Sequence, residues 1–180
     1  METVEQTLAQ PTAVKEEKVR KVAFICSKGN LDMAYPALIM GWAALGNGID
    51  VTYFFTFWGL DLVNKDRVDH LEIPPIGNSS MKMNMMGVPG YVGIPQFMGG
   101  LPGMTAFATS LMKKKMNELN VPTVREFLEM LSDAGAKMYG CKMTVDMFGL
   151  KKEDFLPSLI DVVTAGEFMD MTEDAQIIFI

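Results

Sequence analysis

Short apolar runs alternate along this chain with segments whose apolar residues recur every three or four positions. A strand that is covered on both faces has no polar side, so the short runs predict buried strands. They lie at residues 21–26, 50–57, 136–140, 159–163 and 176–180. Strands that alternate with helices predict a mainly parallel sheet with helices on both of its faces.

Helical patterns occupy most of the intervals between these runs. The first covers residues 31–45, and its predicted buried stripe consists of Leu31, Tyr35, Leu38, Trp42 and Leu45. A longer helix is expected over residues 104–119, and shorter ones over 58–65 and 144–148.

Two further helices carry a start signal known as a capping box. Thr123 is followed by Glu126, and Thr164 by Glu167, so each pair satisfies backbone N–H groups at a helix N-terminus. The helix after Thr123 buries a stripe that we expect to be Val124, Phe127, Leu128 and Leu131. The helix after Thr164 is expected to end near Glu173.

These elements predict an α/β fold, a flavodoxin-like three-layer sandwich with a mainly parallel sheet of about five strands. Right-handed crossovers and short connections leave few strand orders. We expect the flavodoxin-like order, in which the first and third strands are neighbours at a switch point. Residues 1–19 are expected to form a flexible tail, and residues 20–180 a single domain.

One segment does not fit this alternation. Residues 73–103 hold seven Gly, five Pro and five Met, and their one charged residue is Lys82. Large apolar patches are rarely bare on a monomer, so we expect residues 73–119 to line a homo-oligomer interface or to form a lid over the cysteine edge. Peripheral membrane contact is the alternative, in which Lys113–Lys115 serve as an anchor instead of a solvated helix face.

Composition narrows the function classes. The formal net charge is −6, which argues against a nucleic-acid partner. No apolar run reaches the ~18 residues that a membrane span needs, and the first twenty residues lack the apolar core of a signal peptide. Two cysteines do not make a disulfide framework. We therefore expect a cytoplasmic protein, with membrane association left open.

Cofactor and metal signals are weak. The chain lacks the glycine patterns of dinucleotide and P-loop sites, and His70 is its only histidine. Met81–Met86 could bind a soft metal such as Cu(I), but flexible methionine is more often adaptable packing. We expect no cofactor and no bound metal.

Cys141 is the main chemical candidate. It follows a predicted strand, at the edge where open α/β sheets place their sites. It also precedes a short helix for which Thr144 is the expected N-cap, and Lys142 is its neighbour. Helix N–H groups, including those of Met143 and Thr144, and a nearby cation favour the thiolate. The alternative is a buried and inert cysteine, because free cysteine is among the most buried residue types.

Cys26 ends the first strand and, in the assumed strand order, lies at the same edge as Cys141. It takes part in the chemistry or packs in the core. The loop that follows it, with Ser27, Lys28 and Gly29, enters a helix and could hold an anion there.

Three blocks resemble the signature blocks of the DsrE/DsrF-like family. They are Cys26-Ser-Lys-Gly-Asn-Leu-Asp32, Phe54-Phe-Thr-Phe-Trp-Gly59 and Gly140-Cys-Lys-Met-Thr-Val-Asp-Met-Phe-Gly149. The match is best with the Met-rich branch that is found beside TusA-like sulfur carriers, and it extends over residues 20–180. That branch is often labelled a peroxiredoxin family, but the chain has no thioredoxin-like Pro-x-x-x-Thr-x-x-Cys pattern.

The resemblance implies a flavodoxin-like fold, homo-oligomers and sulfurtransferase-type chemistry. Its reactive cysteine maps onto Cys141, which would carry persulfide or thiosulfonate sulfur and exchange it with a small TusA-like carrier protein. Two other functions remain open at this stage. One is a non-catalytic oligomeric or membrane-surface adaptor that uses residues 73–119, and the other is a small-molecule binder at the switch point.

Overall fold

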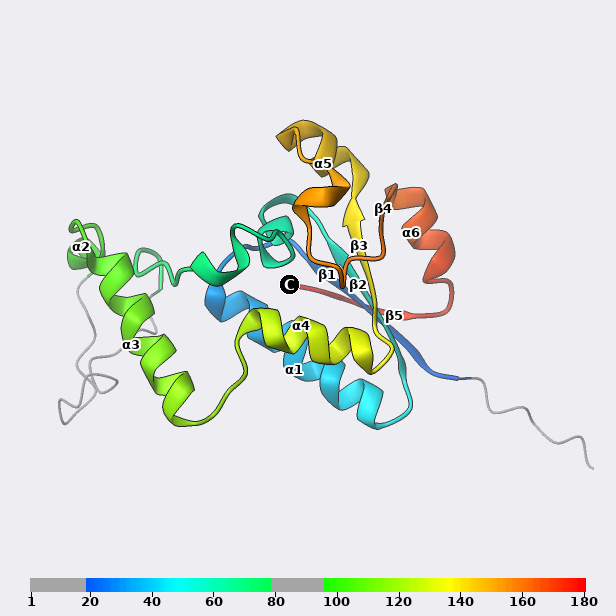
Figure 1. Ribbon diagram of the computed structural model, residues 1–180, viewed down its shortest axis with the longest axis horizontal. Coiled ribbons are helices and arrows are strands. Elements are labelled where there is room, and N and C mark those ends of the chain that lie inside the picture. The colour runs from blue at the N-terminus through cyan, green and yellow to red at the C-terminus, as the bar shows by residue number, and fades with distance from the viewer. Residues whose placement is uncertain (1–18, 79–95) are drawn as a thin grey trace, which may run out of the picture.

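The computed structural model describes residues 19–78 and 96–180. Its centre is a parallel sheet of five strands in the order β4-β3-β2-β1-β5 (Figure 1). The strands are β1 (Lys21–Cys26), β2 (Asp50–Phe55), β3 (Lys137–Cys141), β4 (Asp161–Val163) and β5 (Gln176–Phe179). The expected fold class, a mainly parallel α/β sandwich, is confirmed.

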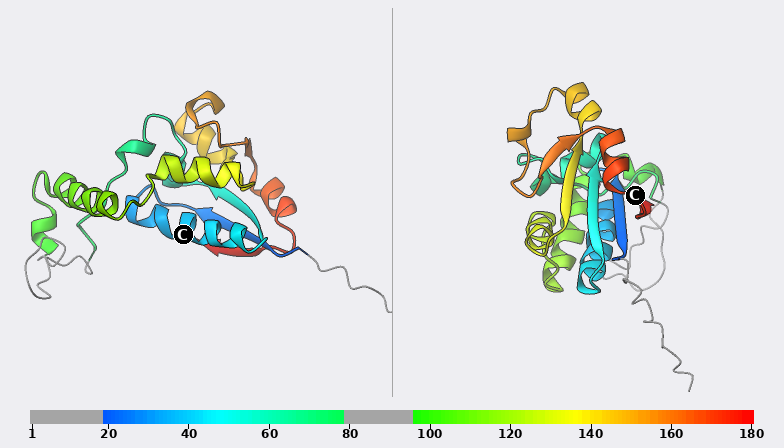
Figure 2. Two further views of the ribbon diagram at one scale, coloured as in Figure 1. Left: turned by 60° about the horizontal axis from the view of Figure 1, so that its bottom comes forward. Right: turned by 90° about the vertical axis from the view of Figure 1, so that its right-hand side faces the viewer.

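Helices cover both faces of this sheet. Figure 2 shows the strands side by side, with α1 and α4 on one face and α6 on the other, while α5 lies beyond the ends of β3 and β4. The α-helices are α1 (Leu31–Gly46), α2 (Gln96–Gly99), α3 (Met104–Glu118), α4 (Val124–Asp133), α5 (Lys142–Phe148) and α6 (Ala165–Met171). Short 3-10 turns are η1 (Phe57–Leu62), η2 (Val68–His70) and η4 (Lys152–Asp154).

The expected strand order is wrong in one respect. β2 lies between β1 and β3, so these two strands are not neighbours, and the chain reverses its winding direction between β1 and β5. The physical reason lies in the strands themselves. β2 is buried on both faces through Tyr53, Phe54 and Phe55, which suits the centre of a sheet, whereas β5 exposes Ile177 and Phe179 and lies at an edge.

The capped helices were predicted closely. Both capping boxes are present, and α4 buries the expected stripe of Val124, Phe127, Leu128 and Leu131. The stripe expected for α1 is right only at Leu31 and Leu38, because the other buried residues of this helix are Ala34, Ala37 and Gly41. Small residues let this helix lie close to the sheet, so that a Cβ on Gly41 would overlap the Tyr53 hydroxyl. Tyr35 and Trp42 instead pack edge-on against Phe127 of α4.

Helices α2 and α3 project from the sheet and form an arm at the left of Figure 1. Only Ala108 and Thr109 of α3 are buried. Within the described residues no helix is long and apolar enough to cross a membrane.

Candidate functional site

Cys141 is the last residue of β3 and lies at the C-terminal edge of the sheet, as expected. The helix that follows begins earlier than predicted. Cys141 itself, not Thr144, occupies the N-cap position, and α5 starts at Lys142. Thr144 therefore lies in the first turn of α5, where its backbone N–H has no partner within the helix. As the N-cap residue, Cys141 directly precedes the N–H groups of that turn.

The pKa of Cys141 is lowered from the ordinary value of a thiol. Burial alone raises it, and this effect is outweighed by hydrogen bonds that the thiolate accepts. The donors are the backbone N–H and the hydroxyl of Thr144, the hydroxyl of Thr56 and the backbone N–H of Met143. Hydrogen bonds to the ionised form favour it, so this environment stabilises the nucleophilic state of the sulfur.

A reactive cysteine is expected to be at least partly accessible, but in the single chain Cys141 is only 5% exposed. It packs with Ala23, Phe54 and Phe168 on the face that α6 covers, and the rings of Phe54 and Phe168 stack with their centroids 4.4 Å apart. The residue is thus buried against apolar groups and hydrogen-bonded to polar ones.

Thr56 is a site residue that sequence analysis missed. It follows β2, and its hydroxyl lies 3.2 Å from that of Thr144, which is fully buried. The backbone N–H of Phe57 donates to the same Thr144 hydroxyl at 3.3 Å. The one available signal was position, because Thr56 ends the strand next to β3 and stands inside the second signature block.

Phe57 has a φ angle of 47°, in the left-handed region that bulky residues rarely adopt. Such backbone costs on the order of 1–2 kcal/mol, so the surrounding contacts must enforce it. Gly59 allows the close approach that does so, since its N–H donates to the carbonyl of Thr56 and a Cβ there would lie 2.0 Å from the carbonyl oxygen of Cys26.

Cys26 is not brought together with Cys141. It is 3% exposed and belongs to the core beneath α1 and α4, on the other face of the sheet. Burial raises the pKa of Cys26 to about 12. The structure places this thiol in the environment of a packing residue.

The loop after Cys26 is occupied by contacts within the fold. Both the backbone N–H and the hydroxyl of Ser27 donate to the carbonyl of Ile180. A Cβ on Gly29 would lie 2.6 Å from the carbonyl oxygen of Trp58, so this glycine permits close packing of η1. Lys28 is exposed.

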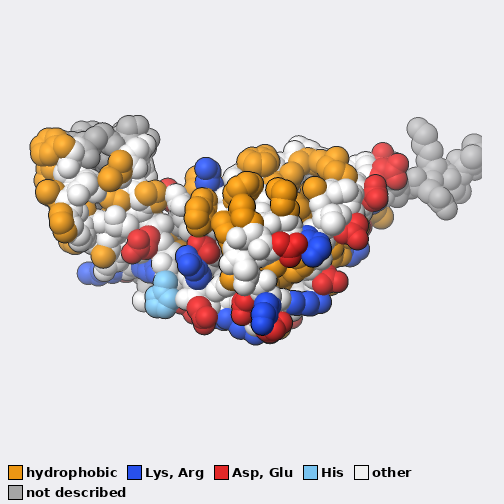
Figure 3. Space-filling view, turned by 90° about the horizontal axis from the view of Figure 1, so that it is seen from above, with side chains coloured by type: hydrophobic (Ala, Val, Ile, Leu, Met, Phe, Trp, Pro, Cys, Tyr) orange, Lys and Arg blue, Asp and Glu red, His pale blue; other side chains and the backbone are white. Residues whose placement is uncertain are grey.

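The side chains around the first turn of α5 are mostly exposed. The ammonium group of Lys142 pairs with Asp146 at 3.2 Å, and Met143 is exposed although its N–H points into the site. Trp58 is 57% exposed and stacks on Phe148 with ring centroids 5.1 Å apart. Figure 3 views the molecule from the side on which α5 lies and shows hydrophobic side chains gathered across its centre.

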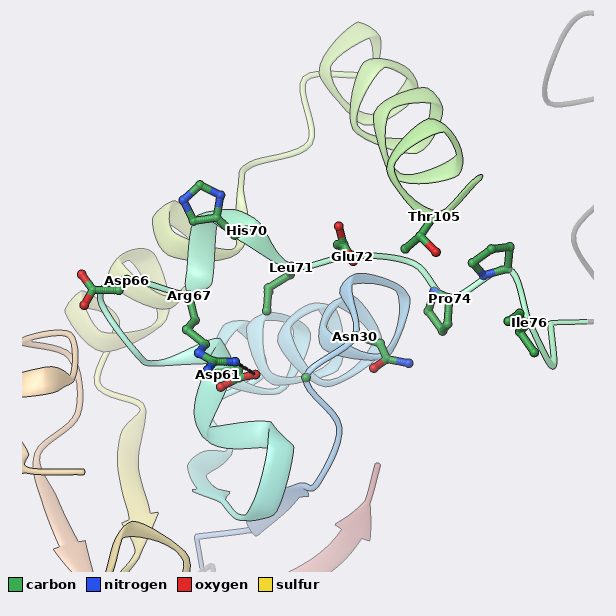
Figure 4. Close-up of a pocket in the computed structure, with 12 residues that line it drawn as sticks. Asn30, Asp61, Asp66, Arg67, His70, Leu71, Glu72, Pro74, Ile76 and Thr105 are labelled. Carbon is green, nitrogen blue, oxygen red and sulfur yellow. Dashed lines mark hydrogen bonds and ion pairs between the residues drawn. The ribbon is translucent and has the colours of Figure 1, made fainter. Parts of the chain in front are cut away.

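A cavity of about 540 Å³ opens beside Gly29 and Asn30, and neither cysteine lines it. Figure 4 shows Asp61 and Arg67 facing each other in this cavity, joined by an ion pair of 3.4 Å, with Glu72 further along its wall. The lining of the cavity therefore combines charged groups of both signs with apolar residues such as Leu71 and Ile76.

In the part of the chain that the structure describes, no three His, Cys, Asp or Glu residues lie close enough together to hold a metal ion. His70 is exposed. The soft-metal alternative at Met81–Met86 falls outside the described residues.

Comparison with known proteins agrees with this fold and with the signature blocks. The profile of the DsrE/DsrF/DrsH-like family matches residues 18–180, and the chain belongs to this family. It is 37% identical over 158 residues to the sulfur carrier protein DsrE2 of Allochromatium vinosum, a match that covers 88% of this chain and 96% of the relative.

Two more distant proteins also match over most of this chain. The uncharacterized protein YrkE of Bacillus subtilis is 25% identical over 164 residues, covering 91% of this chain and 99% of that protein. Among solved structures, the protein of unknown function MTH1491 from Methanobacterium thermoautotrophicum superposes with a TM-score of 0.52 at 11% identity, covering 89% of this chain and 99% of the other. That likeness shows the fold alone.

Proposed function

We propose that this chain is a cytoplasmic sulfur carrier or sulfurtransferase, which accepts sulfane sulfur on Cys141 as a persulfide or thiosulfonate and passes it on. Its similarity to a sulfur carrier supports a role in sulfur transfer in general. The observation that carries the finer proposal is the set of N–H and hydroxyl donors around Cys141, which lowers the pKa of its thiol.

The proposed reaction needs no cofactor. The thiolate of Cys141 attacks the outer sulfur of a donor persulfide, a new S–S bond forms, and the donor's own S–S bond breaks. The donor leaves as a thiolate, and Cys141 keeps the outer sulfur as a persulfide. Only the thiolate is nucleophilic, so a lowered pKa promotes this step. The same donors would stabilise the negative charge when the persulfide ionises.

The acceptor we propose is a small TusA-like carrier protein. Phe57, Trp58, Met143 and Met147 expose apolar surface next to the site, and exposed apolar and aromatic side chains are typical of protein contacts. A protein partner would also have to open the cover over Cys141, because that residue is buried in the single chain.

Intact-mass measurement after incubation with polysulfide tests the proposal. Wild-type protein and the Cys26→Ala variant should both gain the mass of sulfur atoms, which a reducing agent removes. Cys141→Ser should gain none. Circular dichroism of all three proteins shows whether each is folded. If a folded Cys141→Ser variant takes up sulfur as the wild type does, the proposal is wrong.

The adaptor function has one observation in its favour. The arm formed by α2 and α3 carries exposed apolar side chains, among them Phe97, Leu101 and Leu119. Flotation of the protein with liposomes tests membrane contact through this arm. Co-flotation that is lost on replacing Phe97 and Leu101 with Asp would support a membrane-surface adaptor, and wild-type protein that stays in the bottom fraction would exclude that version of the adaptor function.

A further inference from the structure

Thr56 and Phe57, which follow the end of β2, are connected to the site on β3 by a series of hydrogen bonds. The Phe57 N–H donates to the Thr144 hydroxyl oxygen, and the Thr144 and Thr56 hydroxyls are within hydrogen-bond distance of each other. Phe55 is in register with Gly140, so the next residue, Thr56, lies beside Cys141 on the neighbouring strand. The hydroxyls of Thr144 and Thr56 are also among the causes that lower the pKa of Cys141.

The direction of these hydrogen bonds follows from the Phe57 N–H. A backbone N–H can only donate, so the Thr144 oxygen accepts from Phe57 and its hydrogen points elsewhere. That hydrogen goes either to the sulfur or to Thr56, and in the second case the hydrogen of Thr56 is left for the sulfur. In both arrangements one hydroxyl hydrogen is directed at Cys141, and the N–H dipole polarises it.

We propose that Thr56 is a further functional residue at Cys141, and that Phe57 is a positioning residue which acts through Thr144 to aim a hydroxyl hydrogen at the sulfur. The role rests on the proposed function, because it concerns the sulfur that would carry the transferred atom. It also gives a physical reason for the Phe-Phe-Thr-Phe-Trp-Gly block. Thr56 supplies the hydroxyl, Phe57 supplies the N–H from left-handed backbone, and Gly59 permits the turn that holds both.

Titration of Cys141, followed by the ultraviolet absorbance of its thiolate, tests the role of Thr56. The spectrum of Cys141→Ser at each pH is subtracted, and thermal unfolding shows that every variant is folded. Thr56→Val keeps the shape and removes the hydroxyl. Because a charge-assisted hydrogen bond is lost, the titration midpoint of Cys141 should rise by about one pH unit. At a pH below the midpoint, the thiolate fraction should fall about tenfold. Thr56→Ser should restore most of the shift.

Thr52→Val is the matched control, because Thr52 lies within β2, four residues before Thr56. Its midpoint should stay at the wild-type value. An unchanged midpoint in a folded Thr56→Val protein, or an equal rise in Thr52→Val, would overturn the assignment of Thr56.

A double variant tests whether the hydroxyls of Thr56 and Thr144 act through each other. If the two act in series, the shift in Thr56→Val/Thr144→Val should be clearly smaller than the sum of the single shifts. Additive shifts would show that the hydroxyls act separately. For Phe57, the β-branched Phe57→Val resists left-handed backbone and should raise the midpoint more than Phe57→Gly, which adopts it freely. Equal midpoints would remove Phe57 from the site.

Sulfur uptake is measured separately on the same proteins. A wild type that takes up no sulfur would end the proposed function while leaving the titration result intact. A Thr56→Val protein with an unshifted midpoint would end this inference while leaving sulfur uptake on Cys141 standing.

Discussion

Cys26 and Cys141 lie on opposite faces of the sheet, with β2 between their strands. Cys26 is in register with Phe55, and Phe55 with Gly140, so these three residues point to one face and Cys141 points to the other. Two strand spacings of ~4.8 Å and the sheet itself separate the two thiols. A disulfide requires Cβ atoms ~4 Å apart, so this fold does not let Cys26 resolve a sulfur carried by Cys141.

The first prediction concerns the alkaline stability that Cys26 controls. An unfolded cysteine ionises near 9.0, whereas burial raises the pKa of Cys26 in the folded protein to about 12. Between these values only the unfolded chain releases the proton, so the free energy of unfolding should fall as pH rises from 9 to 12. Three pH units correspond to at most about 4 kcal/mol. Urea unfolding at several pH values measures this loss.

Cys26→Ala is the variant that isolates this contribution. It should cost about 1 kcal/mol near neutral pH, as small buried truncations do, but its stability should fall less steeply above pH 9 than that of the wild type. Burial, and after it Cys26 itself, raises the pKa of Tyr53, so the difference between the two proteins also includes the effect of Cys26 on Tyr53. Parallel curves for the two proteins would mean that Cys26 ionises freely in the fold.

The second prediction is the pH dependence of sulfur uptake. The pKa of Cys141 is lowered, so its thiolate persists below the pH at which an ordinary thiol becomes protonated. The uptake rate should therefore reach half its maximum below pH 9.0, the ordinary value. The stability that this thiolate contributes is present above that pH and is lost as pH falls through the lowered pKa. The urea-unfolded chain, alkylated over the same pH range, gives the reference midpoint, and a coincident midpoint for the folded protein would contradict the prediction.

The third prediction compares two glycines at the site. Gly59→Ala would place a Cβ against the carbonyl oxygen of Cys26, so η1 must shift and Thr56 with it. We expect a loss on the order of 1–3 kcal/mol and a higher titration midpoint for Cys141. Gly140→Ala is the control, because its Cβ would meet only side-chain carbons at 3.5 Å or more. It should stay within about 1 kcal/mol of the wild type. A Gly59→Ala protein that matches the Gly140→Ala protein would show that the turn can relax.

The layers of the fold could be predicted from the sequence because local patterns determine them. The capping boxes at Thr123 and Thr164 and the buried stripe of α4 are local signals, and they were confirmed. Strand order is not local. Strand order depends on which strand has two apolar faces to bury. The difference in burial between β2 and β5 is visible only once the pairing of the strands is known.

The candidate site likewise has one residue with local sequence signals and one residue that only the strand order brings near. Cys141 could be proposed from the sequence because it follows a predicted strand, precedes a predicted helix and matches the reactive cysteine that the family resemblance implies. Thr56 is 85 residues away in sequence (141 − 56), and it meets Cys141 only because β2 and β3 are neighbours. The expected strand order also placed Cys26 beside Cys141, whereas β2 separates their strands and the two cysteines belong to opposite faces of the sheet. No residue type at position 26 could have corrected that error.

The last prediction concerns the arm formed by α2 and α3, which stays a candidate homo-oligomer interface. Phe97 is 79% exposed, and Leu101, Phe107 and Leu119 are exposed with it on a helix pair that buries little against the sheet. Apolar surface of this kind is normally covered, so wild-type protein should scatter light as an oligomer. Replacing Phe97 and Leu101 with Asp should lower the mass toward one chain. Ile39→Asp, at an apolar position of α1 that is as exposed as Leu101, should not. A monomeric wild type would contradict this prediction, and dissociation by Ile39→Asp alone would move the interface to α1.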